Sequence, residues 1–132
     1  MTAYFDSSAL AKRYLTEPDS PVATSILDAE PIRVTSMITS IEVRRALAQI
    51  VSAVEHAMAR EQLIIDLTAF QVAHVDVRVC ERAASIAEAT RVRTLDSLHL
   101  ATAVLLGCTR FVTFDRRQAG VAEELGMTVI GG

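Results

Sequence analysis

The sequence predicts an α/β domain in which a mostly parallel sheet is covered by helices on both faces. Two observations predict this class. Short strand-like segments alternate with helical segments along the chain, and the first and fourth strand-like segments are apolar without polar alternation. Such strands are buried on both faces, which requires a layer of helices on each side of the sheet. The length fits a single domain over residues 1–132.

The chain opens with a strand that leads directly into a helix. Residues 3–5 are apolar, and Asp6 with the two serines after it supplies the side chains that begin a helix over residues 9–15. A proline ends this helix, and an Asp-Ser-Pro sequence begins a second helix over residues 22–29. A second strand is expected at residues 32–35.

The middle of the chain is predominantly helical. Apolar residues recur three and four apart over residues 37–68, which predicts a protruding helical hairpin longer than a plain crossover. Residues 70–75 alternate and predict a third strand. Two helices are expected next, over residues 77–89 and over residues 95–106, where Gly107 ends the second one.

The chain closes with a strand, a helix and a strand. Residues 111–114 are apolar and predict the fourth strand. A short helix is expected over residues 116–125, with Gly126 at its carboxyl cap, and a fifth strand at residues 127–130. Strands separated by helices in this way favour parallel pairing.

Composition narrows the function classes. The chain is 51% hydrophobic, which leaves apolar surface for self-association or a protein partner. A formal net charge of −3 argues against a protein that binds nucleic acid through an overall basic surface. No long apolar run and no basic leader occur, so a cytoplasmic protein with no membrane segment is expected. Cys80 and Cys108 lack metal-ligand spacing and are expected to be buried free thiols.

Four acidic residues stand where predicted strands or helices begin or end, inside apolar segments: Asp6, Glu42, Asp96 and Asp115. Asp6 and Asp115 follow strands, and ligands bind outside the carboxyl ends of the strands in open α/β sheets. Glu42 and Asp96, near helix starts, can reach the same rim. Carboxylates that share one site resist ionisation unless a cation neutralises them. The sequence therefore predicts a metal site, provided that the fold brings the four together.

Each acid also has a purely structural interpretation. Asp6 is a good helix N-cap, Thr39 with Glu42 fits a capping box, and Asp96 is a favourable acid for a first helical turn. Asp115 is suited to a loop or a cap. Helix capping alone can produce this pattern, so both interpretations stay open.

Three polar neighbours are candidates for supporting the acids. Thr113, two residues before Asp115 on a predicted strand, should point to the same side and orient that carboxylate. Ser8 lies near a helix start, where it either caps the helix or bonds a carboxylate. His99, one turn after Asp96, is expected to be packed or to support the site, since no second histidine has metal-ligand spacing.

Basic residues lie close in sequence to each acid. Lys12, Arg13, Arg44, Arg45 and Arg116 are the candidates for binding substrate phosphates. Surface ion pairing explains such residues, but a metal cluster rimmed by cations is also what a polyanionic substrate needs.

The segments around the acids also occur in a particular order. They are FDSSAL at residues 5–10, followed by KRY at 12–14 and EP at 17–18, then IEVRRAL at 41–47, LDSLHLATA at 95–103 and VTFD at 112–115. In this order and spacing they resemble the acidic motifs of PIN-domain ribonucleases of the VapC toxin type. The resemblance covers essentially the whole chain.

This resemblance implies a PIN-like fold with a five-stranded sheet of order 3-2-1-4-5, a Mg²⁺ or Mn²⁺ site, and hydrolysis of RNA phosphodiester bonds. It also implies a homodimer or higher assembly and a VapB-type antitoxin that blocks the site. Asp6, Asp96 and Asp115 are then expected to bind the metal, with Glu42 as a ligand or as the residue that orients the attacking water. No further acid follows directly after Asp115, where some relatives carry one, so one or two ions both stay open.

Two alternative functions are weighed beside this one. The chain is either active or an inert PIN-like module that only binds a partner or RNA. A receiver domain that accepts a phosphoryl group on an aspartate is a weaker alternative. Its chemistry needs adjacent acids after the first strand and a lysine late in the chain, whereas Ser7 follows Asp6 and the only lysine is Lys12.

Overall fold

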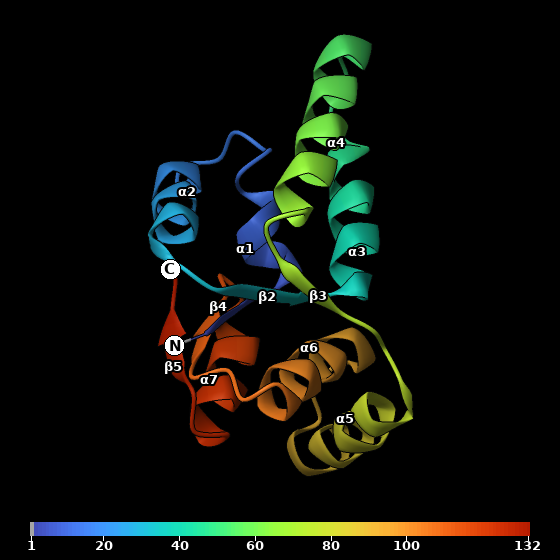
Figure 1. Cartoon of the computed structure of the whole chain (residues 1–132), viewed down its shortest axis with the longest axis vertical. Helices are drawn as coiled ribbons and strands as arrows, with labels where there is room; N and C mark the ends of the chain where they lie inside the picture. Colours follow the sequence, from blue (N-terminus) through green and yellow to red (C-terminus); the bar gives the residue numbers. More distant parts are fainter. Residues whose placement is uncertain (1) are drawn as a thin grey trace.

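A parallel sheet forms the centre of the molecule (Figure 1). The computed structural model describes residues 2–132. Within them the strands are β1 (Ala3–Phe5), β2 (Arg33–Ser36), β3 (Gln71–Ala73), β4 (Arg110–Val112) and β5 (Thr128–Ile130). Their order is β3-β2-β1-β4-β5, and every neighbouring pair is parallel. The predicted fold class and strand order are confirmed.

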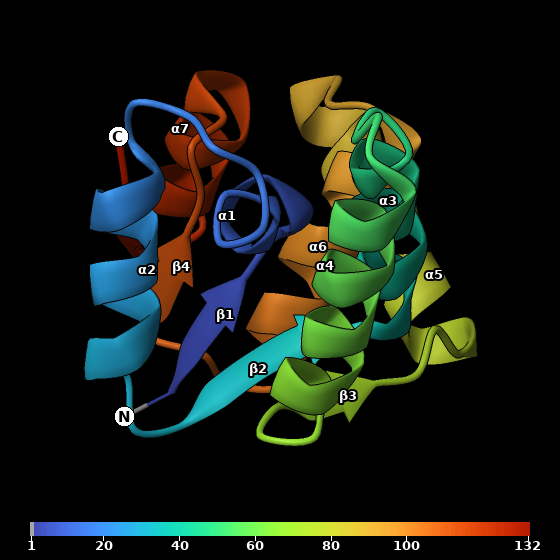
Figure 2. The same ribbon diagram turned by 90° about the horizontal axis from the view of Figure 1, so that it is seen from above.

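Helices cover both faces of this sheet, as predicted. One face carries α1 (Ser7–Ala11), α2 (Ser20–Ala29), α3 (Met37–Leu47) and α4 (Ala53–Leu67), and the other carries α5 (Val77–Thr90), α6 (Thr94–Leu105) and α7 (Arg116–Glu124) (Figures 1 and 2). All helices of the first layer come before all helices of the second layer in the sequence. The two layers therefore come from the two halves of the sequence.

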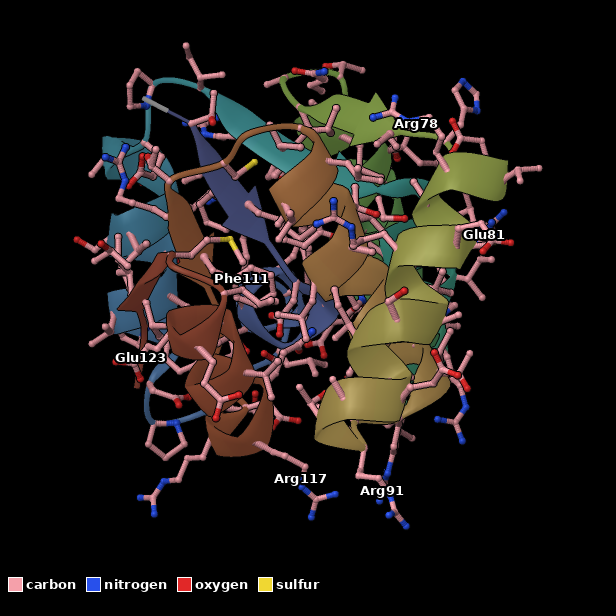
Figure 3. All side chains as sticks on the ribbon, turned by 90° about the horizontal axis from the view of Figure 1, so that it is seen from below. Arg78, Glu81, Arg91, Phe111, Arg117 and Glu123 are labelled. Carbon is pink, nitrogen blue, oxygen red and sulfur yellow. The ribbon has the colours of Figure 1, made fainter. Side chains whose placement is uncertain are left out.

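The central strands contribute to two separate cores because successive side chains of a strand point to opposite faces. Tyr4 is fully buried and stacks on Phe111 with ring centroids 5.3 Å apart. Both belong to the core on the side of α5, α6 and α7, and Figure 3 labels Phe111 on that side of the sheet. Its neighbour Phe5 meets Phe70 edge to face at 5.6 Å on the opposite side. Both faces of β1 are apolar for this reason.

The first helix is shorter than predicted. It begins at the residue after Asp6, because the carboxylate of Asp6 accepts the backbone N–H of Ala9 at 2.9 Å and so caps the helix at once. It ends at Ala11 and does not continue over residues 12–15. Lys12 pairs there with two carboxylates of the following loop, at 2.9 and 3.2 Å, and the chain turns away.

Two local predictions near the acids are wrong. Thr39 and Glu42 form no capping box, because Ser36 is the N-cap of α3 and the hydroxyl of Thr39 is buried against that of Thr35 at 2.7 Å. Thr113 lies one residue beyond β4 and not on a strand. Both differences free the side chains concerned for other contacts.

The helices α3 and α4 form the predicted hairpin. They contact each other and extend together away from the sheet (Figures 1 and 2). Large apolar side chains stay exposed along the hairpin, among them Val54, Met58 and Ile41 at 65–68%. This surface matches the apolar surplus seen in the composition.

The sequence predicts that both cysteines are buried and that the chain has no membrane-spanning segment. Both cysteines are free thiols and Cys108 is buried, but Cys80 is exposed, so the expectation that both are buried is wrong for Cys80. Cys80 lies between the buried positions of the amphipathic helix α5, on its outward side. None of the helices built by residues 2–132 combines the length and the apolarity that crossing a membrane requires.

Candidate active site

The four acids singled out in the sequence line one pocket of about 140 Å³. Asp6 directly follows β1 and Asp115 comes after the end of β4, so the pocket lies at the carboxyl edge of the sheet. Glu42 reaches it from α3, and Asp96 reaches it from the first turn of α6. The other lining residues are Ser7, Ser8, His99 and Gln118. Four separated elements thus deliver four carboxylates to one place.

Asp6 is the most buried of the four and is held by the groups around it. It is 2% exposed, and besides the cap contact it accepts the hydroxyl of Ser8 at 2.7 Å and the hydroxyl of Thr113. Burial raises the pKa of Asp6, and the hydrogen bonds from Thr113, Ser8 and the helix offset this only in part. Thr113 therefore orients Asp6, and not the carboxylate of Asp115 as expected, since it touches Asp115 only by accepting its backbone N–H at 3.0 Å.

Asp96 and Asp115 combine helix-end positions with places in the pocket. Asp115 caps α7 by accepting the N–H groups of Arg117 and Gln118 at 2.9 and 3.2 Å. Asp96 is the acid in the first turn of α6. Burial raises the pKa of Asp96, and the negative charge of Asp115 raises it further. Capping and a shared acidic site therefore coexist, and neither interpretation excludes the other.

Glu42 lies opposite these groups and is fixed by two hydrogen bonds. Its Oε1 accepts the hydroxyl of Ser7 and lies 2.6 Å from Nε2 of His99. Burial opposes its ionisation, yet the hydrogen bonds from His99 and Ser7 lower the pKa of Glu42 below its usual range. The surroundings of Glu42 therefore favour its ionised form, in contrast to those of Asp6 and Asp96.

His99 connects the pocket to the core, a contact that the sequence did not reveal. It is 2% exposed, and its Nδ1 lies 2.6 Å from the hydroxyl of Tyr4. Burial raises the pKa of Tyr4 well above its usual value, so the phenol stays protonated. Its hydroxyl therefore donates a hydrogen bond to Nδ1 of His99. The remaining proton of a neutral imidazole then sits on Nε2 and points at Glu42.

The available signals for these supporting residues were weak. The spacing of one turn between Asp96 and His99 indicated only that the histidine could reach the site. The partners Tyr4 and His99 lie 95 residues apart, and Ser7 and Glu42 lie 35 apart. Such contacts depend on the packing of β1, α3 and α6 and on no local pattern.

Gln118 was also missed as a pocket residue. It is 2% exposed, lies one turn into α7, and its Nε2 donates to the backbone carbonyl of Asp96 at 3.2 Å. It therefore ties the two acidic helix starts together. Its position three residues after the cap Asp115 was the one signal in the sequence.

The candidate phosphate-binding residues are not part of this pocket. Lys12 is held by the ion pairs described above, and Arg13 pairs with Asp66 at 2.7 Å. Arg44 and Arg45 line a separate pocket on the hairpin. Arg116 begins α7 next to Asp115 and is exposed. Only the last three keep their charge available to a ligand.

The donor set of the pocket fits a hard divalent cation in its chemistry. Among residues 2–132, no hydrogen bond reaches either carboxylate oxygen of Asp96, Oδ2 of Asp115 or Oε2 of Glu42. Oxygen ligands of this kind suit Mg²⁺ and Mn²⁺. A bound cation would also relieve the burial and repulsion that raise the pKa of Asp6 and Asp96. As the side chains of residues 2–132 stand, no three His, Cys, Asp or Glu groups already converge on a single ion position.

Comparisons with known proteins agree with this architecture. The family model of the PIN domain matches residues 3–124. The curated relative "Ribonuclease VapC46" of Mycobacterium tuberculosis (strain ATCC 25618 / H37Rv) is 37% identical over 129 residues, which is 96% of this chain and 95% of the relative.

Solved structures share the fold at lower identity. The FitAcB structure from Neisseria gonorrhoeae superposes with a TM-score of 0.78 at 20% identity, covering 97% of this chain and 96% of that one. A toxin–antitoxin complex from Klebsiella pneumoniae gives a TM-score of 0.70 at 18% identity, with 89% of each chain covered. At these identities the likeness shows the fold alone.

Proposed function

The chain belongs to the PIN-domain family, and from this premise we propose that it is a metal-dependent endoribonuclease toxin that hydrolyses RNA phosphodiester bonds. One observation carries the proposal, namely the four carboxylates that line a single pocket at the carboxyl edge of the sheet. The name of the relative VapC46 supports the ribonuclease activity. An inert binding module would have no need to bury Asp6 and crowd Asp96 among like charges.

In this proposal Asp6, Asp96 and Asp115 hold Mg²⁺ or Mn²⁺. When bound, the ion would polarise a water and neutralise charge on the scissile phosphate. Asp96 and Asp115 offer the free oxygens for direct ligation, while Asp6 is kept in place by Ser8 and Thr113. The rigid hold on Asp6 reduces the reorganisation that ligand binding requires.

Glu42 orients the attacking water and accepts its hydrogen bond. Its lowered pKa keeps it ionised at neutral pH, and the hydrogen bonds of His99 and Ser7 to Oε1 leave Oε2 free for water. His99 and Tyr4 are positioning residues, because they act on the reaction only through Glu42. The resemblance to PIN-domain ribonucleases implies that the bond from phosphorus to the 3′ oxygen breaks as water attacks, which leaves a 5′-phosphate and a 3′-hydroxyl.

A protein partner completes the proposal. The fold is shared with a chain of a toxin–antitoxin complex, which supports a small VapB-type antitoxin as the inhibitor. The exposed apolar side chains of the α3–α4 hairpin offer surface for such a partner or for a second copy in a homodimer. The antitoxin would act by denying RNA access to the carboxylate pocket.

The direct test is cleavage of single-stranded RNA by the purified chain. We expect cleavage with Mg²⁺ or Mn²⁺, loss of cleavage on chelation with EDTA, and recovery when the metal is added back. Isothermal calorimetry should show binding of the same ions to the protein alone. A protein that binds neither ion and cleaves no RNA would instead be the inert module.

Tyr4→Phe tests the positioning of Glu42. The substitution removes the hydroxyl that fixes the tautomer of His99 and keeps the ring, so we expect kcat to fall about tenfold at nearly constant KM, as for other groups that support a site through a second residue. The pKa of Glu42 should rise once the His99 hydrogen bond weakens, so the acidic limb of the pH–rate profile should move to higher pH.

Tyr14→Phe is the matched control for this experiment. The hydroxyl of Tyr14 donates to Asp66 at 2.6 Å, outside the carboxylate pocket. The Tyr14→Phe variant therefore loses a hydrogen bond equivalent to the one lost in Tyr4→Phe. It should leave kcat and the pH–rate profile unchanged. An unshifted acidic limb in Tyr4→Phe would show that the tyrosine serves packing only.

A further inference from the structure

A second pocket, rich in positive charge, lies between the two helices of the hairpin. It measures about 330 Å³, and Arg44, Arg45, Leu47 and Ala48 of α3 line it together with His56 and Arg60 of α4. Leu47 is buried and the three arginines are exposed. The pocket therefore combines one buried apolar side chain with three exposed arginines.

The basic side chains of this pocket resemble Arg116 in that no carboxylate pairs with them among residues 2–132. Within residues 2–132, no hydrogen bond or ion pair engages the side chains of Arg44, Arg45, His56 or Arg60. Lys12 and Arg13, in contrast, are paired with carboxylates. In a chain of net charge −3, three arginines without an ion-pair partner among residues 2–132 are available here to an anionic ligand.

Helix electrostatics explain only part of this arrangement. Arg44 and Arg45 lie in the last turn of α3, where positive charge complements the helix dipole. Arg60 and His56 lie along α4 and gain nothing from that end. The acids nearest in sequence, Glu42, Glu55 and Glu61, do not line this pocket, and no ion pair joins them to its arginines within residues 2–132.

The basic pocket and the carboxylate pocket share the helix α3, which contributes Arg44 and Arg45 to the first and Glu42 to the second. Glu42 and Arg45 are three residues apart on that helix, and residues at this spacing are neighbours on one helix face, about 4.5 Å apart along the axis. An RNA strand whose scissile phosphate sits at the carboxylates can thus reach Arg45 within one helical turn, and Arg44 lies further round the helix, two residues from Glu42.

We infer that the basic pocket of Arg44, Arg45, His56 and Arg60 binds the phosphate backbone of the single-stranded RNA that continues beyond the scissile bond. The inference rests on the proposed function. A guanidinium group can donate two parallel hydrogen bonds to the oxygens of one phosphate. Contacts to phosphates supply binding affinity and do not depend on the base sequence. The proximity of Arg45 to Glu42 favours the substrate strand over an acidic protein segment as the occupant.

The test compares Arg60→Glu with the wild-type chain in the cleavage of a long single-stranded RNA with Mg²⁺. Arg60 is exposed on α4, so circular dichroism should show an unchanged fold. We expect KM to rise about tenfold with kcat within about twofold of wild type. The dependence of log KM on log salt should become shallower by roughly 0.7 for each phosphate group that the variant no longer binds.

Two controls isolate the pocket from overall charge. Arg78→Glu makes the same charge change on α5 (Figure 3). Arg78 lies near Thr102 and Leu105, at the opposite end of α6 from Asp96, so this variant should leave KM unchanged. A dinucleotide has only the phosphate that the carboxylate pocket uses, so Arg60→Glu should cleave it as fast as wild type does.

The outcomes are distinguishable. A wild-type chain that cleaves no RNA overturns the proposed function and this inference with it. An active wild type whose KM for the long strand is unaffected by Arg60→Glu overturns the inference alone. Weaker binding of polyglutamate with unchanged KM for RNA would assign the pocket to an acidic protein segment, and would also overturn it.

Discussion

Asp6→Asn is expected to lower RNA cleavage by more than about 100-fold while the protein stays folded. Loss of a group that only supports a metal ligand typically costs roughly 10–100-fold, and Asp6 is proposed to hold the ion itself. Asparagine keeps an oxygen that can accept the Ala9 N–H, so the cap of α1 survives. Single-turnover assays measure the loss of cleavage, and calorimetry with Mn²⁺ measures the loss of metal binding.

Asp76→Asn separates helix capping from metal chemistry. Asp76 caps α5 by accepting the N–H of Val79 at 2.9 Å, the same geometry with which Asp6 caps α1, but it lies outside the carboxylate pocket. Full activity of Asp76→Asn beside an inactive Asp6→Asn assigns the loss to the carboxylate pocket. Equal activity of the two variants would mean that Asp6 serves only as a cap.

Asp96→Asn is expected to abolish cleavage to the same extent and, at the same time, to stabilise the metal-free protein. At neutral pH an ionised Asp96 is desolvated and repelled by Asp115, and asparagine removes that charge. Solvent screening at this half-buried position limits the gain, so we expect the melting temperature to rise by roughly 2–4 °C. Thermal denaturation in EDTA measures it.

The pH dependence of this gain has a definite sign. The pKa of Asp96 is raised in the folded state, so folding favours its protonated form and wild-type stability falls as the pH rises through the titration range of the carboxyl. Wild type and Asp96→Asn should therefore have similar melting temperatures below about pH 4 and separate above it. A variant that is less stable than wild type at pH 7 would contradict the repulsion.

Mg²⁺ should reverse the order of stability. A cation that binds the folded wild-type pocket stabilises it increasingly as its concentration rises, whereas the variant lacks one of the ligands. The melting temperature of wild type should then rise with added metal while that of Asp96→Asn stays nearly constant. A matching rise in both proteins would place the ion elsewhere.

Local sequence patterns predicted most of the fold and the acids of the pocket. Apolar strands and helical periodicity follow from burial, which acts on each element separately, so the α/β class needed no distant contact. Asp6 and Asp115 were found because they stand at strand ends, where a parallel sheet gathers its functional groups. The strand order came from the resemblance to PIN-domain ribonucleases and is confirmed.

The residues that sequence reasoning missed all depend on tertiary packing. Tyr4 looked like an ordinary strand residue, and only the placement of α6 on β1 brings its hydroxyl to His99. His56 and Arg60 joined the basic pocket because of the way α4 lies against α3, whereas neither is close in sequence to an acid of the site. Thr113 was expected to orient the carboxylate of Asp115 because the fourth strand was predicted to include it. The strand β4 ends at Val112, and the hydroxyl of Thr113 donates to Asp6.

The hydrogen bond between Thr113 and Asp6 has a consequence for protein synthesis. It joins residues 107 positions apart, and it forms where β1 pairs with β4 in the middle of the sheet. A nascent chain that has emerged only as far as α5 holds Asp6 and Glu42 but has neither Asp96 nor Asp115, so it lacks half of its carboxylates. The carboxylate pocket is therefore complete only when nearly the whole chain has been translated and folded, so the proposed ribonuclease would be inactive while it is still being made.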